Sequence, residues 1–247
     1  MRIPRIYTAQ PLCVGSDAEL DEIATHHIAK VLRMQVGQLL ELFNGDQQNY
    51  QATITAIHKK RMVVAVTHNT PGVPASRLHT HIGQVISKGD RMDYMVQKAT
   101  ELGVNIITPL FSERCDVRLN KEREEKRIRH WQQIAINASE QCGRTDVPEI
   151  RPGRTLDAWC QDATEAVRLV MYHHQNETLS TIFAADKNPE SATVLVGPEG
   201  GLTEEEVAIA MNHQFKPVKL GNRVFRTETA PVAALTLLQW HWGDFAL

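Results

Sequence analysis

The chain has 247 residues, 42% of them hydrophobic, so it is long enough for one large domain or two ordinary ones and too apolar to be disordered throughout. Its 27 Lys and Arg residues nearly balance 29 Asp and Glu residues, which argues against a tail-driven nucleic-acid binder but permits a basic patch on one face. The scattered cysteines, the charged N-terminus and the lack of a long apolar run indicate neither a disulfide framework nor a signal peptide nor a membrane span. We therefore expect a soluble, cytoplasmic protein.

The first seventy residues carry a mostly β pattern. Apolar residues from Leu20 to Leu32 fall at helical spacing and predict one amphipathic helix that stops near Gly37. The flanking segments alternate or end in turn residues, and they predict a small β-barrel. The predicted strands are residues 2–8, 39–43, 50–57 and 62–67.

The segment 69–76 holds two prolines and a glycine among polar residues, so we place the domain boundary there, with domains 1–72 and 73–247. Beyond it, predicted strands alternate with predicted helices, which indicates an α/β domain with a mostly parallel sheet. The strands are expected at 78–86, 104–111, 147–150, 168–173, 193–196 and 217–220, and the helices at 90–102, 121–141, 156–166, 203–212 and 229–242.

Two loops follow predicted strands and precede predicted helices, the position at which open α/β sheets bind ligands. The first reads GPEGG (197–201), whose glycines let bare backbone approach a ligand, although a simple turn at a helix start explains the loop equally well. It is neither a P-loop nor G-x-G-x-x-G. The second, LGNRVFRTETA (220–230), sets two arginines beside Glu228. Two such loops, each at a strand end, favour a shared site.

Longer motifs extend this pattern over nearly the whole chain. LVGPEGGLTEEE and LGNRVFRTETA closely resemble the RsmE family of bacterial 16S rRNA (uracil-N3) methyltransferases, part of the SPOUT superfamily, as do MRIPRIY, HIAKVLRM, KGDRMDYMVQKATELGVNIITPLFSERC and NASEQCGRTDVPEI. The resemblance implies an N-terminal PUA-like β-barrel and a C-terminal α/β domain ending in a trefoil knot. It implies methylation of N3 of a uridine near the 3′ end of 16S rRNA, conventionally position 1498, with S-adenosylmethionine as cofactor.

Carried over to this sequence, the family's cofactor pocket has three walls. The strand end near Met171 departs from the family pattern, because Tyr172 and His173 follow it. The residues expected to bind the cofactor are Met171, Val196, Gly197, Pro198, Glu199, Gly200, Gly201, Leu220, Gly221, Val224, Arg226, Thr227, Glu228, Thr229 and Ala230.

The chemistry suggests roles for three charged residues. Uracil N3 carries a proton at neutral pH, so a cation beside the base oxygens would stabilise the charge that develops as the proton leaves. We assign that catalytic role to Arg226, with Glu228 orienting it or the ribose. Glu199 suits a general base only if its pKa is raised.

The resemblance also implies partners. RNA contacts are expected from the first domain, which has a net charge of +1, through Arg2, Arg5, Lys30 and Arg33. The last helix is apolar nearly all round, and SPOUT enzymes are homodimers, so we predict a homodimer built partly on that helix. The histidines show no metal-site spacing, and Cys142 is expected to be a buried small residue.

Three alternatives stay open from the sequence. A SPOUT enzyme with another RNA target would use the same pocket. A ribosome-assembly factor that no longer methylates is opposed by the intact loops, and a nucleotide-binding protein unrelated to RNA is opposed by the missing phosphate motif.

Overall fold

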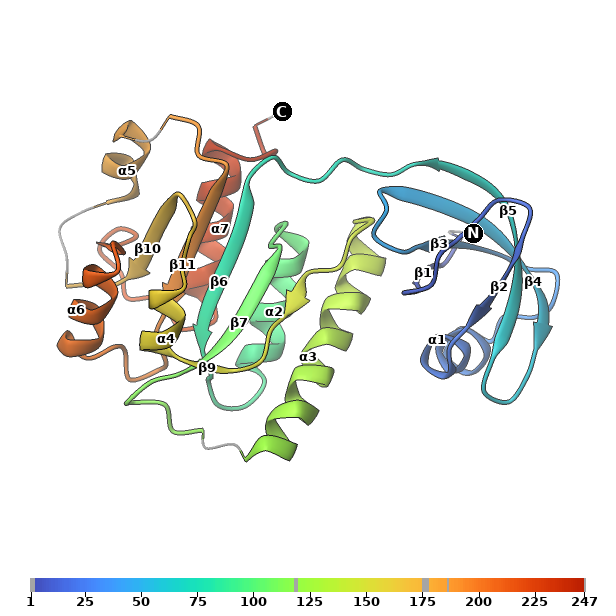
Figure 1. The fold of residues 1–247 in the computed structure, drawn as a ribbon, viewed down its shortest axis with the longest axis horizontal. Helices are drawn as coiled ribbons and strands as arrows, with labels where there is room; N and C mark the ends of the chain where they lie inside the picture. The colour runs from blue at the N-terminus through green and yellow to red at the C-terminus, as the bar shows by residue number, and fades with distance from the viewer. Residues whose placement is uncertain (1–2, 118–119, 175–177, 186, 247) are drawn as a thin grey trace. The chain divides into compact units, whose positions relative to one another are not determined.

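In a computed structural model that describes residues 3–117, 120–174, 178–185 and 187–246, the chain forms two compact units (Figure 1). The first unit consists of Met1–Ala75 and Ser139–Val147, and the second of Ser76–Ala138 and Pro148–Leu247. No pattern in the sequence indicates that 139–147 packs with the N-terminal residues.

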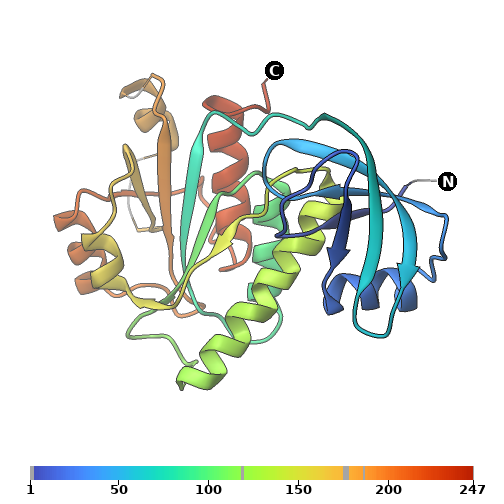
Figure 2. The ribbon, with the colours of Figure 1, turned by 45° about the vertical axis from the view of Figure 1, so that its right-hand side comes forward.

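The first unit is a curled five-stranded sheet with strand order β1-β3-β4-β5-β2 (Figure 2). Strand β1 runs parallel to β3, and the other neighbours are antiparallel. Alternate residues of the long strands, such as Ala52, Ile54, Val64 and Val66, point into one apolar core, as the alternating pattern predicts. The strands are β1 (Arg5–Tyr7), β2 (Asp17–Leu20), β3 (Leu39–Phe43), β4 (Gln48–Ile57) and β5 (Met62–Pro71).

The helix predicted from Leu20 to near Gly37 is present but shorter, with helical structure only over residues 22–31. Leu20 belongs to β2 and pairs with Met62, so the helix α1 (Glu22–His26) begins only after Asp21, whose carboxylate caps it by accepting from the Ala24 amide at 2.8 Å. A π-helical turn, η1 (His27–Val31), follows directly.

Only part of the expected apolar face is buried: Ile28 lies in the core and Ala24 packs against it. Val31 is 60% exposed, and Ile23 of α1 is 63% exposed. Strand β5 also differs from its prediction: it continues to Pro71, into the segment expected to be a linker, because Thr70 and Pro71 still pair with β4.

The second unit holds a sheet of seven strands in which every pairing is parallel, which confirms the predicted α/β class. The strand order is β12-β10-β11-β6-β7-β8, and β9 pairs with β7. The strands are β6 (His79–Val85), β7 (Ile106–Phe111), β8 (Glu149–Ile150), β9 (Arg154–Thr155), β10 (Val167–Met171), β11 (Ser191–Val196) and β12 (Lys216–Val218).

Helices cover both faces of this sheet (Figures 1 and 2). One apolar core joins the sheet to α4 and α6, and another joins it to α5 and α7. The helix α5 was not predicted. Asp90 precedes α2, and its side chain makes no capping hydrogen bond. The helices are α2 (Arg91–Glu101), α3 (Lys121–Cys142), α4 (Leu156–Gln161), α5 (Leu179–Ala185), α6 (Glu204–Asn212) and α7 (Thr229–His241).

Among the described residues, no helix combines the length and the apolar character needed to cross a membrane.

Candidate functional site

A cavity of about 740 Å³ opens where the neighbouring strands β12, β10 and β11 end. This volume lies within the range of small-molecule and cofactor sites. Three loops form its walls: residues 172–174 after β10, 197–202 after β11 and 219–228 after β12. The carboxyl ends of parallel strands meet at one edge of a sheet, so segments distant in sequence converge here.

The 197–202 loop needs glycine at two positions. Gly201 has φ +70° and donates its amide to Pro198 O at 2.9 Å, closing a tight turn that other residues adopt only under strain. A Cβ on Gly197 would lie 2.9 Å from Leu202 Cγ, closer than real contacts allow. The helix α6 anchors the end of the loop, because Thr203 and Glu206 form a reciprocal capping box.

A buried hydroxyl joins this loop to the 219–228 loop. Thr227 Oγ1 donates to Gly197 O at 2.7 Å and accepts from Gln84 Nε2 at 2.9 Å. Gln84 belongs to β6 and is 1% exposed, so it reaches the two loops from inside the sheet. Its second bond, to Val85 O at 3.1 Å, fixes the amide. The relay from Gln84 through Thr227 to Gly197 therefore holds both cavity walls against the sheet.

Charged groups link the cavity walls to neighbouring segments. Glu199 accepts from the Lys88 amide at 2.9 Å and pairs with the Arg91 guanidinium. Arg91 Nε also lies 3.8 Å from Glu228 Oε2. Arg114, in the segment after β7, donates to Gly200 O at 3.0 Å.

This environment bears on the role considered for Glu199. Burial by itself would raise the pKa of the Glu199 carboxyl, but hydrogen bonds from its own amide and the Lys88 amide, together with Arg91, lower that pKa below its usual value. A carboxylate with a lowered pKa is a weaker proton acceptor. The structure therefore does not provide the raised pKa that a general base at Glu199 requires.

The third wall follows β10. Met171 packs on the apolar core of the sheet, and the Tyr172 amide donates to Val218 O at 2.9 Å. The rings of Tyr172 and His174 meet edge to face, with centroids 5.3 Å apart. This wall thus offers aromatic surface to the cavity, beside the backbone groups of the glycine loop.

The cavity brings together most residues expected to bind a cofactor. Of that set, Gly221 and Thr229 do not line it: Gly221 shapes the loop with φ +71°, and Thr229 begins α7. The lining residues from the expected set are Met171, Val196, Gly197, Pro198, Glu199, Gly200, Gly201, Leu220, Val224, Arg226, Thr227, Glu228 and Ala230.

The sequence reading missed other residues of the site. Arg91 and Arg114 stand after strands β6 and β7, and both lie within the motif KGDRMDYMVQKATELGVNIITPLFSERC, which is the signal that could have drawn attention to them. Gln84 is a polar residue in a predicted apolar strand, and that mismatch is the one signal that could have drawn attention to it.

The charged residues expected to act on the base are placed differently from one another. Arg226 is exposed at the cavity, and its side chain makes no hydrogen bond or ion pair with the described residues. Glu228 is mostly buried and faces Arg91 rather than Arg226. Among the described residues, no side-chain hydrogen bond or ion pair joins Glu228 to Arg226, so the structure does not support the expectation that Glu228 orients Arg226.

The residues expected to contact RNA divide in two. Lys30 of η1 and Arg33, two residues after η1, are exposed, while Arg2 lies outside the described residues. The Arg5 side chain is only 9% exposed and pairs with Glu41 at 2.6 Å.

The remaining donors of Arg5 are also satisfied within the first unit. The guanidinium donates to Asn49 Oδ1 and to backbone carbonyls of residues 139, 140 and 144, and it lies over the Phe43 ring. Arg5 thus fastens 139–147 to the sheet, a placement that favours a structural role over an RNA contact.

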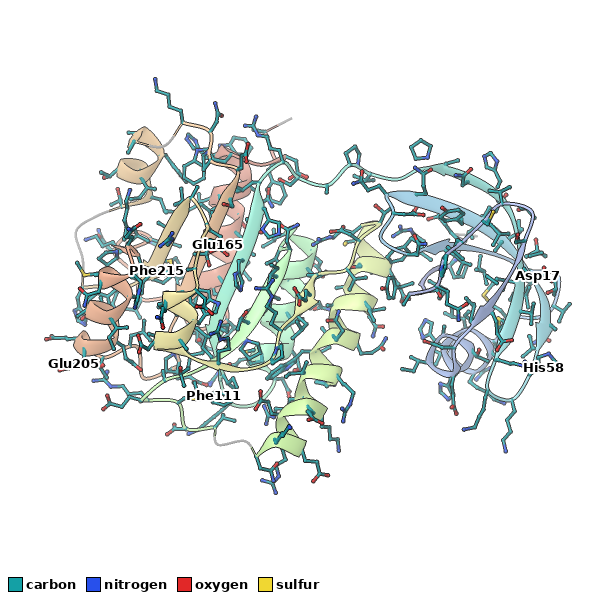
Figure 3. All side chains as sticks on the ribbon, viewed as in Figure 1. Asp17, His58, Phe111, Glu165, Glu205 and Phe215 are labelled. Atoms are coloured by element: carbon teal, nitrogen blue, oxygen red, sulfur yellow. The ribbon has the colours of Figure 1, made fainter. Side chains whose placement is uncertain are left out.

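A second polar cluster lies away from the cavity. His81 Nδ1 is 2.7 Å from Glu165, which lies in the connection between α4 and β10 (Figure 3), and its Nε2 is 2.8 Å from Thr108 Oγ1. Trp159 Nε1 lies 3.3 Å from His81 Nε2, and none of these side chains lines the 740 Å³ cavity. Within the described ranges, no three His, Cys, Asp or Glu side chains are grouped to hold a metal.

One cysteine differs from its prediction. Cys142 is exposed at the end of α3, not buried, whereas Cys160 of α4 is buried. The last turn of α3 packs through Ser139 and Ala138 instead, which turns Cys142 outward.

The matching family models and two relatives of this chain are all described as RNA methyltransferases. Residues 74–239 match a family model described as an RNA methyltransferase domain, and residues 20–67 match one described as an RNA methyltransferase PUA domain. The chain is 36% identical over 248 residues to the ribosomal RNA small subunit methyltransferase E of Buchnera aphidicola subsp. Schizaphis graminum, covering 99% of each chain. It is 28% identical over 224 residues to the protein of that name from Bacillus subtilis, covering 87% of this chain and 86% of that one.

Two solved structures are similar over the full length. A methyltransferase of Legionella pneumophila in complex with S-adenosylmethionine has a TM-score of 0.94 and 39% identity, over 99% of this chain and 100% of that one. A ribosomal RNA small subunit methyltransferase E of Neisseria gonorrhoeae bound to S-adenosylmethionine has a TM-score of 0.89 and 36% identity, over the same shares.

Proposed function

Because the chain belongs to the ribosomal RNA small subunit methyltransferase E family, we propose that it methylates N3 of one uridine near the 3′ end of 16S rRNA. It is an S-adenosylmethionine-dependent rRNA methyltransferase. The observation that supports this function best is the cavity at the ends of β10, β11 and β12, walled by the two loops that carry the family motifs.

The residues present fit the cofactor. Gly200 and Gly201 have no side chains, which leaves room for a ligand close to the backbone. Val196, Leu220 and Ala230 supply apolar surface that excludes water from a bound nucleoside. The cofactor supplies an activated methyl group on a sulfonium sulfur. We assign its binding to the lining residues of the three walls, with Gly221 and Thr229 shaping the 219–228 wall and its end.

Methyl transfer depends strongly on positioning, because the N3–C bond forms in line with the S–C bond that breaks. The N3 proton must leave, and negative charge then spreads onto the uracil oxygens. Arg226 has an exposed guanidinium at the cavity with no competing partner in the described parts of the chain, so it is free to stabilise that charge. Glu228 Oε2 is buried at the cavity wall without a hydrogen bond, which suits it to accept one from the bound ribose.

We extend the proposal to the RNA partner. Residues 1–72 would form the RNA-binding, PUA-like barrel and residues 73–247 the catalytic SPOUT domain, with 139–147 packing on the barrel. Exposed Lys30 and Arg33 are well placed to grip phosphates. A protein that modifies the small ribosomal subunit would work in the cytoplasm.

We also propose that the chain is a homodimer. Trp240 of α7 is 62% exposed and Leu237 is 39% exposed, whereas Ala234 and Leu238 are fully buried against the sheet. Large apolar side chains exposed on a helix that is otherwise buried are typical of a subunit interface. The trefoil knot belongs to this proposal too: the 219–228 loop would thread α7 past the 197–202 loop.

The experiment that tests the function is a methylation assay with labelled S-adenosylmethionine and small subunits from cells that lack the activity. We expect one 3-methyluridine near the 3′ end of 16S rRNA, mapped by mass spectrometry. The variant Arg226→Ala should keep the fold and lose turnover. Unchanged turnover in this variant would remove Arg226 from the mechanism, and transfer to a different RNA would refute the assigned target.

A further inference from the structure

One arginine joins three segments of the cavity that are far apart in the sequence. Arg91 is the first residue of α2, Glu199 lies in the 197–202 loop, and Glu228 ends the 219–228 loop. The Arg91 guanidinium pairs with Glu199 through Nη1 and lies 3.8 Å from Glu228 Oε2 through Nε. A planar guanidinium presents donors in fixed directions, so one side chain can hold two carboxylates at once.

Neighbouring contacts hold the two carboxylates that face Arg91, which distinguishes these ion pairs from ordinary solvent-exposed ones. Glu199 Oε1 also accepts from the Lys88 amide at 2.9 Å, so the carboxylate is held by a backbone group as well as by the guanidinium. Glu228 is 14% exposed, which shields its attraction to Arg91 from solvent. Arg91 itself remains 40% exposed and lines the cavity.

We propose that Arg91 is a positioning residue that fastens the 197–202 and 219–228 loops to the start of α2 and so sets the separation of two cavity walls before the cofactor binds. The inference rests on the proposed function, because it concerns the same cavity. Loops held in the binding geometry spare the free energy of ordering them, so the clamp raises affinity for the cofactor. Arg91 acts through Glu199 and Glu228 and has no part in bond making.

The test measures binding of S-adenosylmethionine by calorimetry for wild type and Arg91→Met, with thermal unfolding recorded for both. We expect the Kd to rise about tenfold and KM for the cofactor to rise with it, while kcat stays within about twofold. Arg91→Lys keeps the charge and one donor, so it should recover part of the affinity. This second variant also decides the matter if Arg91→Met fails to fold.

Lys88→Met is the matched control. Lys88 stands three residues before Arg91 and its side chain pairs with exposed Asp116 at 2.6 Å, so the substitution removes a nearby positive charge but keeps the amide that binds Glu199. Its Kd should equal that of wild type. In the Glu199→Gln background, the effect of Arg91→Met should shrink, because the clamp has already lost one carboxylate.

Three results separate the possibilities. If wild type binds the cofactor and Arg91→Met binds within about twofold of it, the clamp does not position the cavity, whatever its effect on thermal stability. If Lys88→Met weakens binding as much as Arg91→Met, the loss of nearby positive charge explains the weaker binding, and the proposed Arg91 clamp is refuted. If wild type itself binds no S-adenosylmethionine, the proposed function fails and this inference falls with it.

Discussion

Replacing Thr227 with valine tests how the two cavity loops are held together. The substitution keeps the shape of the side chain and removes the hydroxyl that links Gln84 Nε2 to Gly197 O. Thr227 is 7% exposed and Gln84 is 1% exposed, so the groups left behind find little water. An orphaned buried polar group costs about 1–3 kcal/mol, and Gln84 keeps its bond to Val85 O, so we expect a loss of about 2 kcal/mol.

Both stability and binding should respond. For a unit of this size, such a loss lowers Tm by about 4–8 °C. Because Gly197 is freed from the relay, the Kd for S-adenosylmethionine should rise as well. Thr193→Val is the matched control: Thr193 is fully buried in β11 and its hydroxyl donates to His81 O at 3.0 Å, away from the cavity. The control should lower Tm similarly and leave the Kd unchanged.

A double-mutant cycle with Gln84→Leu sharpens the test. Once the amide is gone, Thr227→Val orphans only the Gly197 carbonyl, so its cost should fall by about 1 kcal/mol. Gln84→Leu alone measures the cost of removing the amide, which donates to both Thr227 Oγ1 and Val85 O. Costs that add within about 0.5 kcal/mol would refute the relay.

Three further predictions follow from buried side chains. Arg5→Met should destabilise the first unit by about 2 kcal/mol in urea unfolding and speed amide exchange in 139–147, because it leaves the partly exposed Glu41 carboxylate and three backbone carbonyls without their donor, whereas exposed Lys30→Met should change stability by less than about 0.5 kcal/mol. Burial would raise the pKa of Glu165, but the hydrogen bond to His81 lowers it below 4.5. Its ionised form therefore stabilises the fold above that pH and the contribution is lost as the pH falls through the folded value, so Tm should drop less steeply on acidification in Glu165→Gln than in wild type. Burial raises the pKa of Cys160 to about 12, so this thiol should react with a thiol reagent only after unfolding; rapid labelling of the native protein would contradict the packing of α4.

The element types of this protein were largely readable from the sequence, because they depend on neighbouring residues. The alternation of β4 is a local signal that the structure confirms. Gly103, with φ +83° just after α2, and Thr203, which caps α6, are signals of the same local kind. The two cavity loops were also readable, since glycine-rich turns after strands have a recognisable pattern.

Local signals failed where a distant strand competed for the same residues. The apolar spacing from Leu20 onward fits a helix, but Leu20 pairs with Met62 as the last residue of β2, so the helix begins only at Glu22. The π turn at His27–Val31 likewise has no marker in the sequence. Secondary-structure propensity is too weak to outweigh such tertiary contacts.

The contacts that shape the cavity were decided by the tertiary structure alone. Arg91 meets Glu199 across 108 residues, and Gln84 meets Thr227 across 143. A single arginine or glutamine is chemically ordinary, and its role comes only from the partner that parallel strands bring to the same edge of the sheet. The sequence by itself therefore determined which loops could hold a ligand, and the fold determined which side chains hold those loops in place.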